Sequence, residues 1–183
     1  SSPRRSRGGF AVRCWWWTAA SASETMRFQL IDRIVEIEPG RHARGRKAVA
    51  SSEDFFADHF PGNPVMPGVL VLESLAQTAG ALLAASSGFE RFGLMTLVEN
   101  AKFRAFVRPG DILETHVVIA SADDSVARVE GTASVEGSVV AAARLSFVLV
   151  PIGTIVPAIY AEGWVHLLKG WLAGHGRTPG EPL

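Results

Sequence analysis

The chain has 183 residues, and its 18 Lys and Arg balance 18 Asp and Glu, so the formal net charge is zero. This length suits one globular domain with extensions, and a composition of 48% hydrophobic and 20% charged residues excludes a chain that is disordered throughout. The lack of excess positive charge disfavours a nucleic-acid binder. The single cysteine, Cys14, cannot form an internal disulfide, and no Cys/His cluster has zinc-site spacing, so we predict no metal site.

The charges are unevenly distributed along the chain. Residues 1–23 carry four arginines and no acid, whereas residues 51–150 hold twelve acids and six bases, a net charge of −6. The basic leader is also rich in Ser and Ala, which is typical of sequence upstream of a start at Met26 or of an organellar transit peptide. We therefore divide the chain into a leader (1–25) that we expect to be disordered, a folded domain (26–151) and a C-terminal extension (152–183).

The first and last thirds of the domain show strand patterns. Two strand candidates, Phe28–Ile37 and Arg46–Ala50, are separated by the turn signal Pro39–Gly40. Three consecutive runs then alternate apolar and polar residues: Leu113–Ile119, Val126–Glu136 and Val139–Leu149. Plausible hairpin turns between them are residues 122–124 and Gly137–Ser138. The alternation predicts an antiparallel meander with one buried face, toward which Val139 and every second residue after it point.

The residues between these strand regions predict one long helix. The run Pro67–Ala85 is apolar nearly all round, which is typical of a buried helix, and proline suits the first helical position. Glu73, Gln77 and Gly80 interrupt the run, so we predict no transmembrane span. A core helix wrapped by an antiparallel sheet, in an α+β fold, explains the pattern better.

Glu73 is the most informative residue of that helix. Burying a charged carboxylate is costly, so a carboxyl group in an apolar helix tends to stay protonated and can serve as a general acid. Gln77 follows four residues later on the same helical face, within hydrogen-bonding reach. A purely structural Glu–Gln pair, or a glutamate that faces solvent, would give the same pattern.

The loop before the helix carries a candidate base. Three prolines and two glycines within residues 61–68 fix an irregular loop, and His59 stands just before it among phenylalanines. A histidine in apolar surroundings stays mostly neutral at pH 7, as a base should. The helix N-terminus adds unpaired backbone N–H groups at the same place. A lone loop histidine is often structural, but base, acid and N–H donors together point to an enzyme that acts on a carbonyl compound.

Two stretches of the chain resemble the FabZ-type (3R)-hydroxyacyl-acyl-carrier-protein dehydratases. The first is His59–Leu70, continuing to Glu73 and Ala76–Gln77, and the second is Ala101–Arg104, continuing to Arg108–Asp111. The similarity extends over roughly residues 27–151. It implies a hotdog fold, in which a curved antiparallel sheet wraps a central helix, and a homo-oligomer, at least a dimer with shared active sites.

The resemblance also implies roles for individual residues. His59 would remove the C2 proton of a 3-hydroxyacyl thioester, and Glu73 of the partner subunit would protonate the departing hydroxyl. The backbone N–H of Gly68 or Val69 would hold the thioester oxygen, and Gln77 would orient Glu73. Because the acid is Glu rather than the Asp of FabA-type enzymes, dehydration to the trans-2-enoyl thioester without isomerisation is favoured. The family uses no metal or redox cofactor.

Further positions follow from the same resemblance. The acyl tunnel and its loop would involve Phe60, Pro67, Phe92 and Leu94, and the stretch from Phe92 to Val98 lacks the aromatic gate of many relatives. An acidic acyl carrier protein would meet the basic residues Arg91, Lys102, Arg104 and Arg108, of which Lys102 and Arg104 share one strand face. These bases are equally consistent with a solvated surface.

Two other functions are consistent with parts of the same pattern. A hotdog acyl thioesterase would use the acidic helix residue to activate water, but has no use for His59, and a catalytically silent scaffold subunit would need neither residue. In the extension, Tyr160, Trp164, Leu167, Leu168, Trp171 and Leu172 recur at helical spacing. This predicts an amphipathic helix that packs on the core or a dimer mate, or docks on a membrane surface or partner. We expect a cytoplasmic protein, or an organellar one if residues 1–25 are a transit peptide.

Overall fold

The computed structural model of the protein describes residues 28–155, 165 and 168–172. In chain order its elements are β1 (Arg33–Glu38), β2 (His42–Ala48), the short 3-10 helix η1 (Asp54–Phe56), α1 (Gly68–Ser86), β3 (Arg91–Phe103), β4 (Ile112–Ala122), β5 (Val126–Val135), β6 (Ser138–Pro151) and the short helix α2 (Ile152–Ile155). The predicted leader, residues 1–25, lies outside the described residues.

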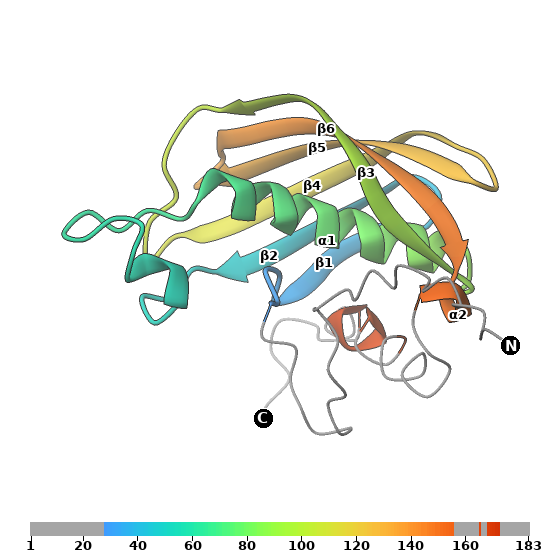
Figure 1. Ribbon diagram of the computed structural model, residues 1–183, viewed down its shortest axis with the longest axis horizontal. Helices are drawn as coiled ribbons and strands as arrows, with labels where there is room; N and C mark the ends of the chain where they lie inside the picture. Colours follow the sequence, from blue (N-terminus) through green and yellow to red (C-terminus); the bar gives the residue numbers. More distant parts are fainter. Residues whose placement is uncertain (1–27, 156–164, 166–167, 173–183) are drawn as a thin grey trace, which may run out of the picture.

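The six strands form one antiparallel sheet in the order β1-β2-β4-β5-β6-β3. The sheet curves over one side of α1, so that the helix runs along its concave face (Figure 1). This is the α+β hotdog architecture predicted from the sequence. The pairing leaves β1 at one edge and β3, the strand that follows α1, at the other.

The predicted meander is confirmed, because β4, β5 and β6 are consecutive neighbours in the sheet. The prediction that Val139 faces the core is wrong. Val139 is 44% exposed and Val140 is 3% exposed. The cause is a register shift between β5 and β6 at Ala133/Ser134, which changes the face on which the first residues of β6 lie.

Several predicted boundaries also differ in the structure. Strand β2 runs from His42 to Ala48, whereas Arg46–Ala50 was predicted. The β5–β6 turn is Glu136–Gly137 rather than Gly137–Ser138, and both turn residues have positive φ, as the tightest hairpin turns require. The first strand begins at Arg33 instead of Phe28. Residues 28–30 lie outside the sheet, because the side chain of Gln77 bonds the carbonyl of Phe28 and the N–H of Leu30.

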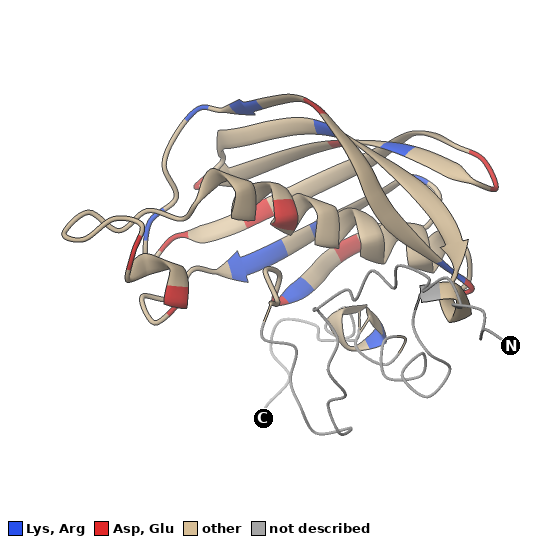
Figure 2. Ribbon diagram, viewed as in Figure 1, with Lys and Arg blue, Asp and Glu red and all other residues tan. Residues whose placement is uncertain are grey.

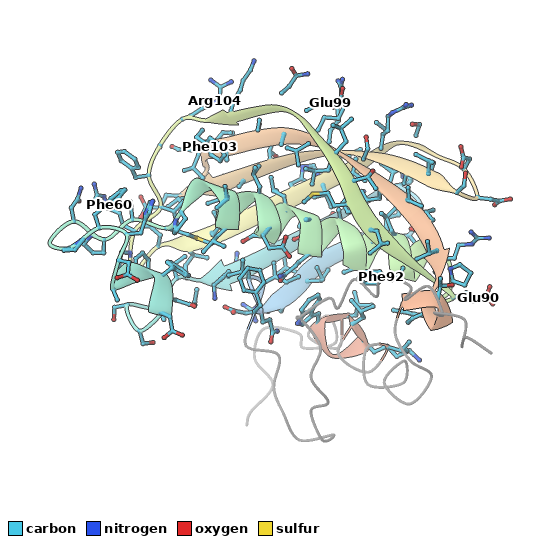
Figure 3. All side chains as sticks on the ribbon, viewed as in Figure 1. Phe60, Glu90, Phe92, Glu99, Phe103 and Arg104 are labelled. Carbon is cyan, nitrogen blue, oxygen red and sulfur yellow. The ribbon has the colours of Figure 1, made fainter. Side chains whose placement is uncertain are left out.

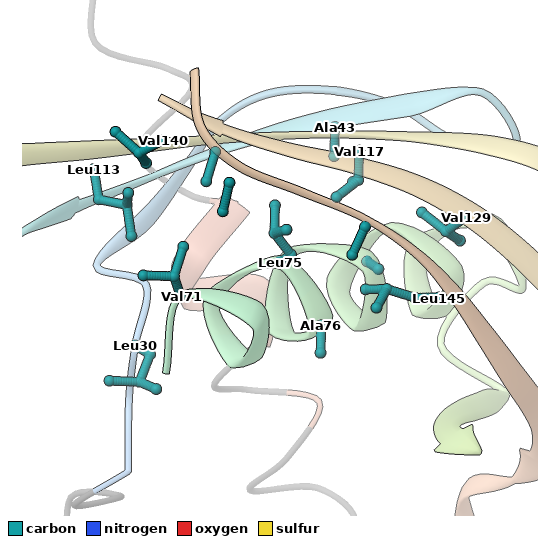
Figure 4. Close-up of a cluster of buried hydrophobic side chains, with 14 of the residues drawn as sticks. Leu30, Ala43, Val71, Leu75, Ala76, Leu113, Val117, Val129, Val140 and Leu145 are labelled. Atoms are coloured by element: carbon teal, nitrogen blue, oxygen red, sulfur yellow. The ribbon is translucent and has the colours of Figure 1, made fainter. Parts of the chain in front are cut away.

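The hydrophobic core lies between α1 and the concave face of the sheet (Figure 4). From the helix come Val71, Leu75, Ala79 and Leu82, and from the strands come inward side chains such as Leu113, Val117, Val129 and Leu145. Leu75, Ala79, Leu113, Val117, Val129 and Leu145 have no exposed surface. Burial of this apolar surface fixes the helix on the sheet.

A buried polar contact fixes the position of the helix more closely. The hydroxyl groups of Thr78 on α1 and Thr115 on β4 lie 2.7 Å apart, and both residues are buried. Gly45 on β2 makes room for them, because a Cβ at this position would lie 2.6 Å from the Thr115 hydroxyl oxygen and 2.8 Å from that of Thr78. The glycine therefore allows a close approach that any other residue would block.

Helix α1 is almost uncharged, and Glu73 is its only charged residue (Figure 2). By length and hydropathy it could cross a membrane, but 56% of its apolar window is buried inside the protein. It is packed as a core helix, as predicted. The helix begins at Gly68, one residue later than expected, because the extended ψ of Pro67, 132°, places that residue at the N-cap.

The described part of the C-terminal extension packs on the core. Residues 168–172 are helical, and Leu168 and Trp171 are 2% and 4% exposed. They form a second cluster with Ala81 and Ala84 of α1 and with Ile31 and Ile34 at the start of the sheet. In Figure 1 this segment lies below the sheet, near β1. Packing on the core is therefore confirmed for these residues, whereas Tyr160, Trp164 and Leu167 lie outside the described residues.

Candidate active site

His59 is held by backbone contacts on both sides. Its N–H donates to the carbonyl of Phe55 in η1 (3.1 Å), and its carbonyl accepts from the N–H of Val65 (2.9 Å). The ring Nδ1 lies 2.9 Å from the carbonyl oxygen of Val65. Because a carbonyl can only accept, Nδ1 carries the proton, and Nε2 of the neutral ring is left with a free lone pair. The loop therefore presents Nε2 as a base.

Phe60 packs against this ring. The two ring centroids are 4.0 Å apart in a stacked arrangement, and 52% of Phe60 is exposed. Figure 3 shows Phe60 on the loop that precedes α1. The aromatic ring of Phe60 therefore covers one face of the imidazole.

The first turn of α1 offers backbone donors. No side chain caps the helix, and within the described residues no hydrogen bond uses the N–H of Gly68 or Val69. Free N–H groups at the positive end of a helix can stabilise a developing oxyanion. The aromatic ring of Phe103, at the end of β3, lies over this turn, because a Cβ on Gly68 would be 2.8 Å from it. Pro67 and Gly68 thus shape a narrow approach to the donors.

Glu73 lies one to two turns further along the helix and is half-buried. The Nε2 of Gln77 donates to its carboxylate at 3.1 Å and also to the carbonyl of Phe28 at 3.1 Å. The Oε1 of Gln77 accepts from the N–H of Leu30 at 2.8 Å, which fixes the orientation of the amide. Gln77 therefore holds Glu73 in one position, as the four-residue spacing predicted.

The environment of Glu73 favours its protonated form. Burial raises the pKa of the Glu73 carboxyl above its ordinary value, and the hydrogen bond from Gln77 opposes part of this rise. Burial dominates because it removes water from the charged form without supplying a cation. The carboxyl group is therefore suited to donate a proton.

The two candidate catalytic side chains are not joined within one chain. Over the described residues, no hydrogen bond or ion pair connects His59 to Glu73, and each has its own set of partners. Nor do these residues contain a group of three or more His, Cys, Asp or Glu that could hold a metal ion. The structure thus presents a histidine, free backbone donors and a carboxyl group, each held by its own contacts.

Two residues predicted to line the acyl tunnel point elsewhere in the single chain. Gly93 of β3 faces α1, since a Cβ there would lie 3.0 Å from Leu83. Its neighbours Phe92 and Leu94 lie on the opposite face by strand alternation, and Leu94 pairs with the exposed Val148. The role of Phe92 and Leu94 in the acyl tunnel stays a prediction, and Met95, which is 39% exposed, shares the inner face with Gly93.

The four predicted carrier-contact residues do not form one patch in a single chain. Arg108 is next to the histidine loop, where its guanidinium donates to the side-chain oxygen of Asn63 at 2.8 Å. Arg104 directly follows the end of β3, where its N–H donates to the carbonyl of Val140 at 2.8 Å, and Lys102 lies two residues earlier on the strand. Arg91 begins β3, at its opposite end, and donates to the carbonyl of Asp124.

Sequence reasoning missed the position of Phe103. The residue belongs to the second matching stretch, directly after Lys102, but only its contact with Gly68 shows that it borders the free N–H groups. Figure 3 places Phe103 near the start of α1. An aromatic residue at the last position of an otherwise polar strand end was the available signal.

A six-stranded sheet wrapped around an apolar helix, with a histidine loop before it and a carboxyl group on it, defines a hotdog-fold protein. Solved structures share this fold. The dehydratase heterocomplex ApeI:P from Xenorhabdus doucetiae matches with a TM-score of 0.57 at 15% identity, covering 68% of this chain and 85% of that chain. The protein smu.793 from Streptococcus mutans, bound to acetyl CoA, matches with a TM-score of 0.53 at 16% identity, covering 65% and 88%.

Sequence comparison identifies the family. The family described as the FabA-like domain matches residues 23–144, so the chain belongs to the FabA-like family. Among relatives, the 3-hydroxyacyl-[acyl-carrier-protein] dehydratase FabZ of Bartonella bacilliformis is 48% identical over 125 residues, covering 67% of this chain and 81% of the relative. The protein of the same name from Bacillus subtilis is 43% identical over 123 residues, covering 67% and 87%.

Proposed function

We propose that the protein is a 3-hydroxyacyl-[acyl-carrier-protein] dehydratase of fatty-acid biosynthesis, a hydro-lyase that forms trans-2-enoyl thioesters. The observation that carries this proposal is that the chain presents both a base and an acid. His59 has a free Nε2, and Glu73 is held by Gln77 in surroundings that favour its protonated form. Relatives of the chain that carry the dehydratase name support it.

The chemistry needs one proton removed and one supplied. Nε2 of His59 takes the C2 proton of the substrate, and the electron pair moves toward the thioester carbonyl. The N–H groups of Gly68 and Val69 donate to the oxygen on which charge develops. Glu73 gives its proton to the 3-hydroxyl group, the C3–O bond breaks, and water leaves as the C2–C3 double bond forms. Each acid–base partner supplies about 10²–10⁴-fold in rate.

The acid and base would come from two subunits. His59 would act with Glu73 of the partner subunit, since no bond joins the two within the described part of one chain. Strand β3, 13 residues long, lies at an edge of the sheet and can pair with a second copy. Exposed apolar residues surround the site, among them Val69 at 68% and Phe106 at 70%. Such surface favours at least a dimer.

An acyl carrier protein is the proposed source of the thioester. Arg108 beside the histidine loop and the exposed Lys102 and Arg104 offer positive charge near the start of α1. An acidic carrier would be attracted to such a surface. The cytoplasmic location stays a prediction.

The test is an assay with a 3-hydroxyacyl thioester on acyl carrier protein. The protein should form the enoyl thioester and release no free thiol, and His59→Ala and Glu73→Gln should each lower the rate about 10²–10⁴-fold. His116→Ala is the matched control, because this exposed histidine lies on β4 away from the loop, and should leave the rate unchanged. Release of free thiol would favour a thioesterase. No turnover, or full activity of either site variant, would refute the assignment.

A further inference from the structure

Lys47 is a buried cation that the proposed chemistry does not use. It lies on β2 on the inward face, and its side chain is 5% exposed. Its partner in the sheet register is Leu113, which is fully buried. A lysine in such a position costs free energy unless its ammonium group is paired, so a specific partner is required.

The partner is Glu53, directly before the segment that carries His59. The Nζ of Lys47 lies 2.6 Å from a Glu53 carboxylate oxygen, and 3.9 Å from one of Asp32. The Glu53 side chain is 26% exposed and that of Asp32 is 49% exposed, so the pair with Glu53 is the better shielded of the two. Shielding from water strengthens the attraction between the charges. The short distance and the burial make Glu53 the principal anchor.

Glu53 is linked to His59 through the short helix η1. Glu53 is the N-cap of η1, and its carbonyl accepts from the N–H of Phe56 at 3.1 Å. The carbonyl of Phe55, in turn, accepts from the N–H of His59 at 3.1 Å. Phe56 is 8% exposed and belongs to the main core. Two hydrogen bonds and a buried ring therefore separate the ion pair from the candidate base.

We propose that Lys47 is a positioning residue for His59. Its ion pair with Glu53 fixes the start of η1 on β2, and η1 sets where the imidazole ring stands. Neither Lys47 nor Glu53 touches the substrate in this arrangement. A displacement of about 1 Å at a reacting group can cost about 10²-fold in rate. An ion pair that holds η1 in place can therefore affect turnover without touching the substrate. The inference rests on the dehydratase function proposed above.

The decisive variant is Lys47→Met, which keeps the length of the side chain and removes the charge. We expect kcat to fall about 10-fold to 100-fold, with KM changed less than about threefold, at a temperature where the variant is fully folded. The ring nitrogen resonances of His59, recorded by NMR, should shift. Arg144→Met is the matched control, since it breaks an exposed ion pair with Glu130 (3.0 Å) and should change neither readout.

A second variant covers the case in which Lys47→Met does not fold. Glu53→Gln alters the partly exposed member of the pair, and we expect the same shift of the His59 resonances with about a tenfold fall in kcat. If both variants fold, the double variant should show a fall in kcat no larger than that of the more affected single variant. The reason is that both substitutions remove the same ion pair.

The outcomes separate the two proposals. Unchanged kcat and unchanged His59 resonances in a folded variant would overturn the positioning role, as would effects that multiply in the double variant. If the wild-type protein shows no dehydration, the proposed function fails. The His59 resonances of Lys47→Met or Glu53→Gln still decide whether the ion pair positions the ring.

Discussion

The two ends of α1 differ in how completely the chain itself covers them. At the first turn, Val69 is 68% exposed, and no side chain caps the helix. At the last turns, Leu82, Leu83 and Ala84 are each at most 3% exposed, and the N–H of Ser87 closes on carbonyls of the final turn. Residues of the C-terminal extension pack against this second end. We therefore call the N-terminal end of α1 the open end and its C-terminal end the closed end.

The difference shows where the fold reserves room for a ligand. The N-terminus of a helix leaves N–H groups without partners and the C-terminus leaves carbonyl groups, and a protein either satisfies these groups or leaves them free to bind a ligand. Here the closed end gives the helix a fixed position, and the open end keeps its donors beside Phe103, in the element that follows the His59 loop. Rigid support at one end and free donors at the other are what a preorganised site needs.

The largest effect is expected from removing a side chain that covers the closed end of α1. Trp171→Ala should lower the free energy of unfolding by about 3–5 kcal/mol, because it leaves a cavity where the indole packs on Ala81 and Ala84. Denaturant unfolding measures this loss. Turnover at low temperature should stay near wild type, since the open end is not touched.

Lys169→Ala is the control for this prediction. Lys169 is exposed in the same turn, and its ammonium lies 5.4 Å from the centre of the Phe89 ring. Its loss should cost at most about 1 kcal/mol. Equal free energies of unfolding for Trp171→Ala and the wild type would show that residues 168–172 do not stabilise the closed end of α1.

The second prediction crowds the open end. Gly68→Ala places a methyl group 2.8 Å from the Phe103 ring, so the ring must move. Because Phe103 is 53% exposed it can move, and we expect little change in stability but about a 10-fold to 100-fold fall in kcat/KM. Steady-state kinetics and thermal unfolding check the two parts.

Gly80→Ala is the matched substitution in the same helix. A Cβ at Gly80 meets nothing within 4 Å, so alanine should raise stability by about 0.5–1 kcal/mol and leave kinetics unchanged. If both glycine variants had the same kinetics as the wild type, the narrow approach at Gly68 would have no role.

The smallest effect concerns the pH dependence of stability through Glu73. Burial raises the pKa of this carboxyl in the folded protein, so its favourable contribution is complete in acid and is lost as the pH rises through that raised pKa. Glu73→Gln removes the titration. The free energy of unfolding of the variant, minus that of the wild type, should therefore rise from about pH 4 to about pH 8. Unfolding curves at both pH values test the sign, and a constant difference would contradict it.

Local patterns predicted much of the fold and part of the site. The alternation in residues 113–149 identified the meander, and the four-residue spacing of Glu73 and Gln77 gave their hydrogen bond. The face of Val139 was mispredicted because a bulge depends on the partner strand, which the pattern of one strand does not contain. The faces of Phe92 and Leu94 could not be assigned for a related reason, since which side of β3 meets α1 depends on the pairing with β6.

The amino-acid sequence was sufficient to predict the class of fold, the chemical groups and their order along the chain. Periodicity and residue type are local properties, and they specify a buried helix, its carboxyl group and the histidine loop before it. Only the folded chain shows that Phe103 borders Gly68, because these two residues are far apart in the sequence, and that Lys47 pairs with Glu53, because the turn between β2 and η1 brings the two side chains together. It also decided that the tail covers one end of α1 and leaves the other open, since that follows from how apolar surfaces are shared between distant segments.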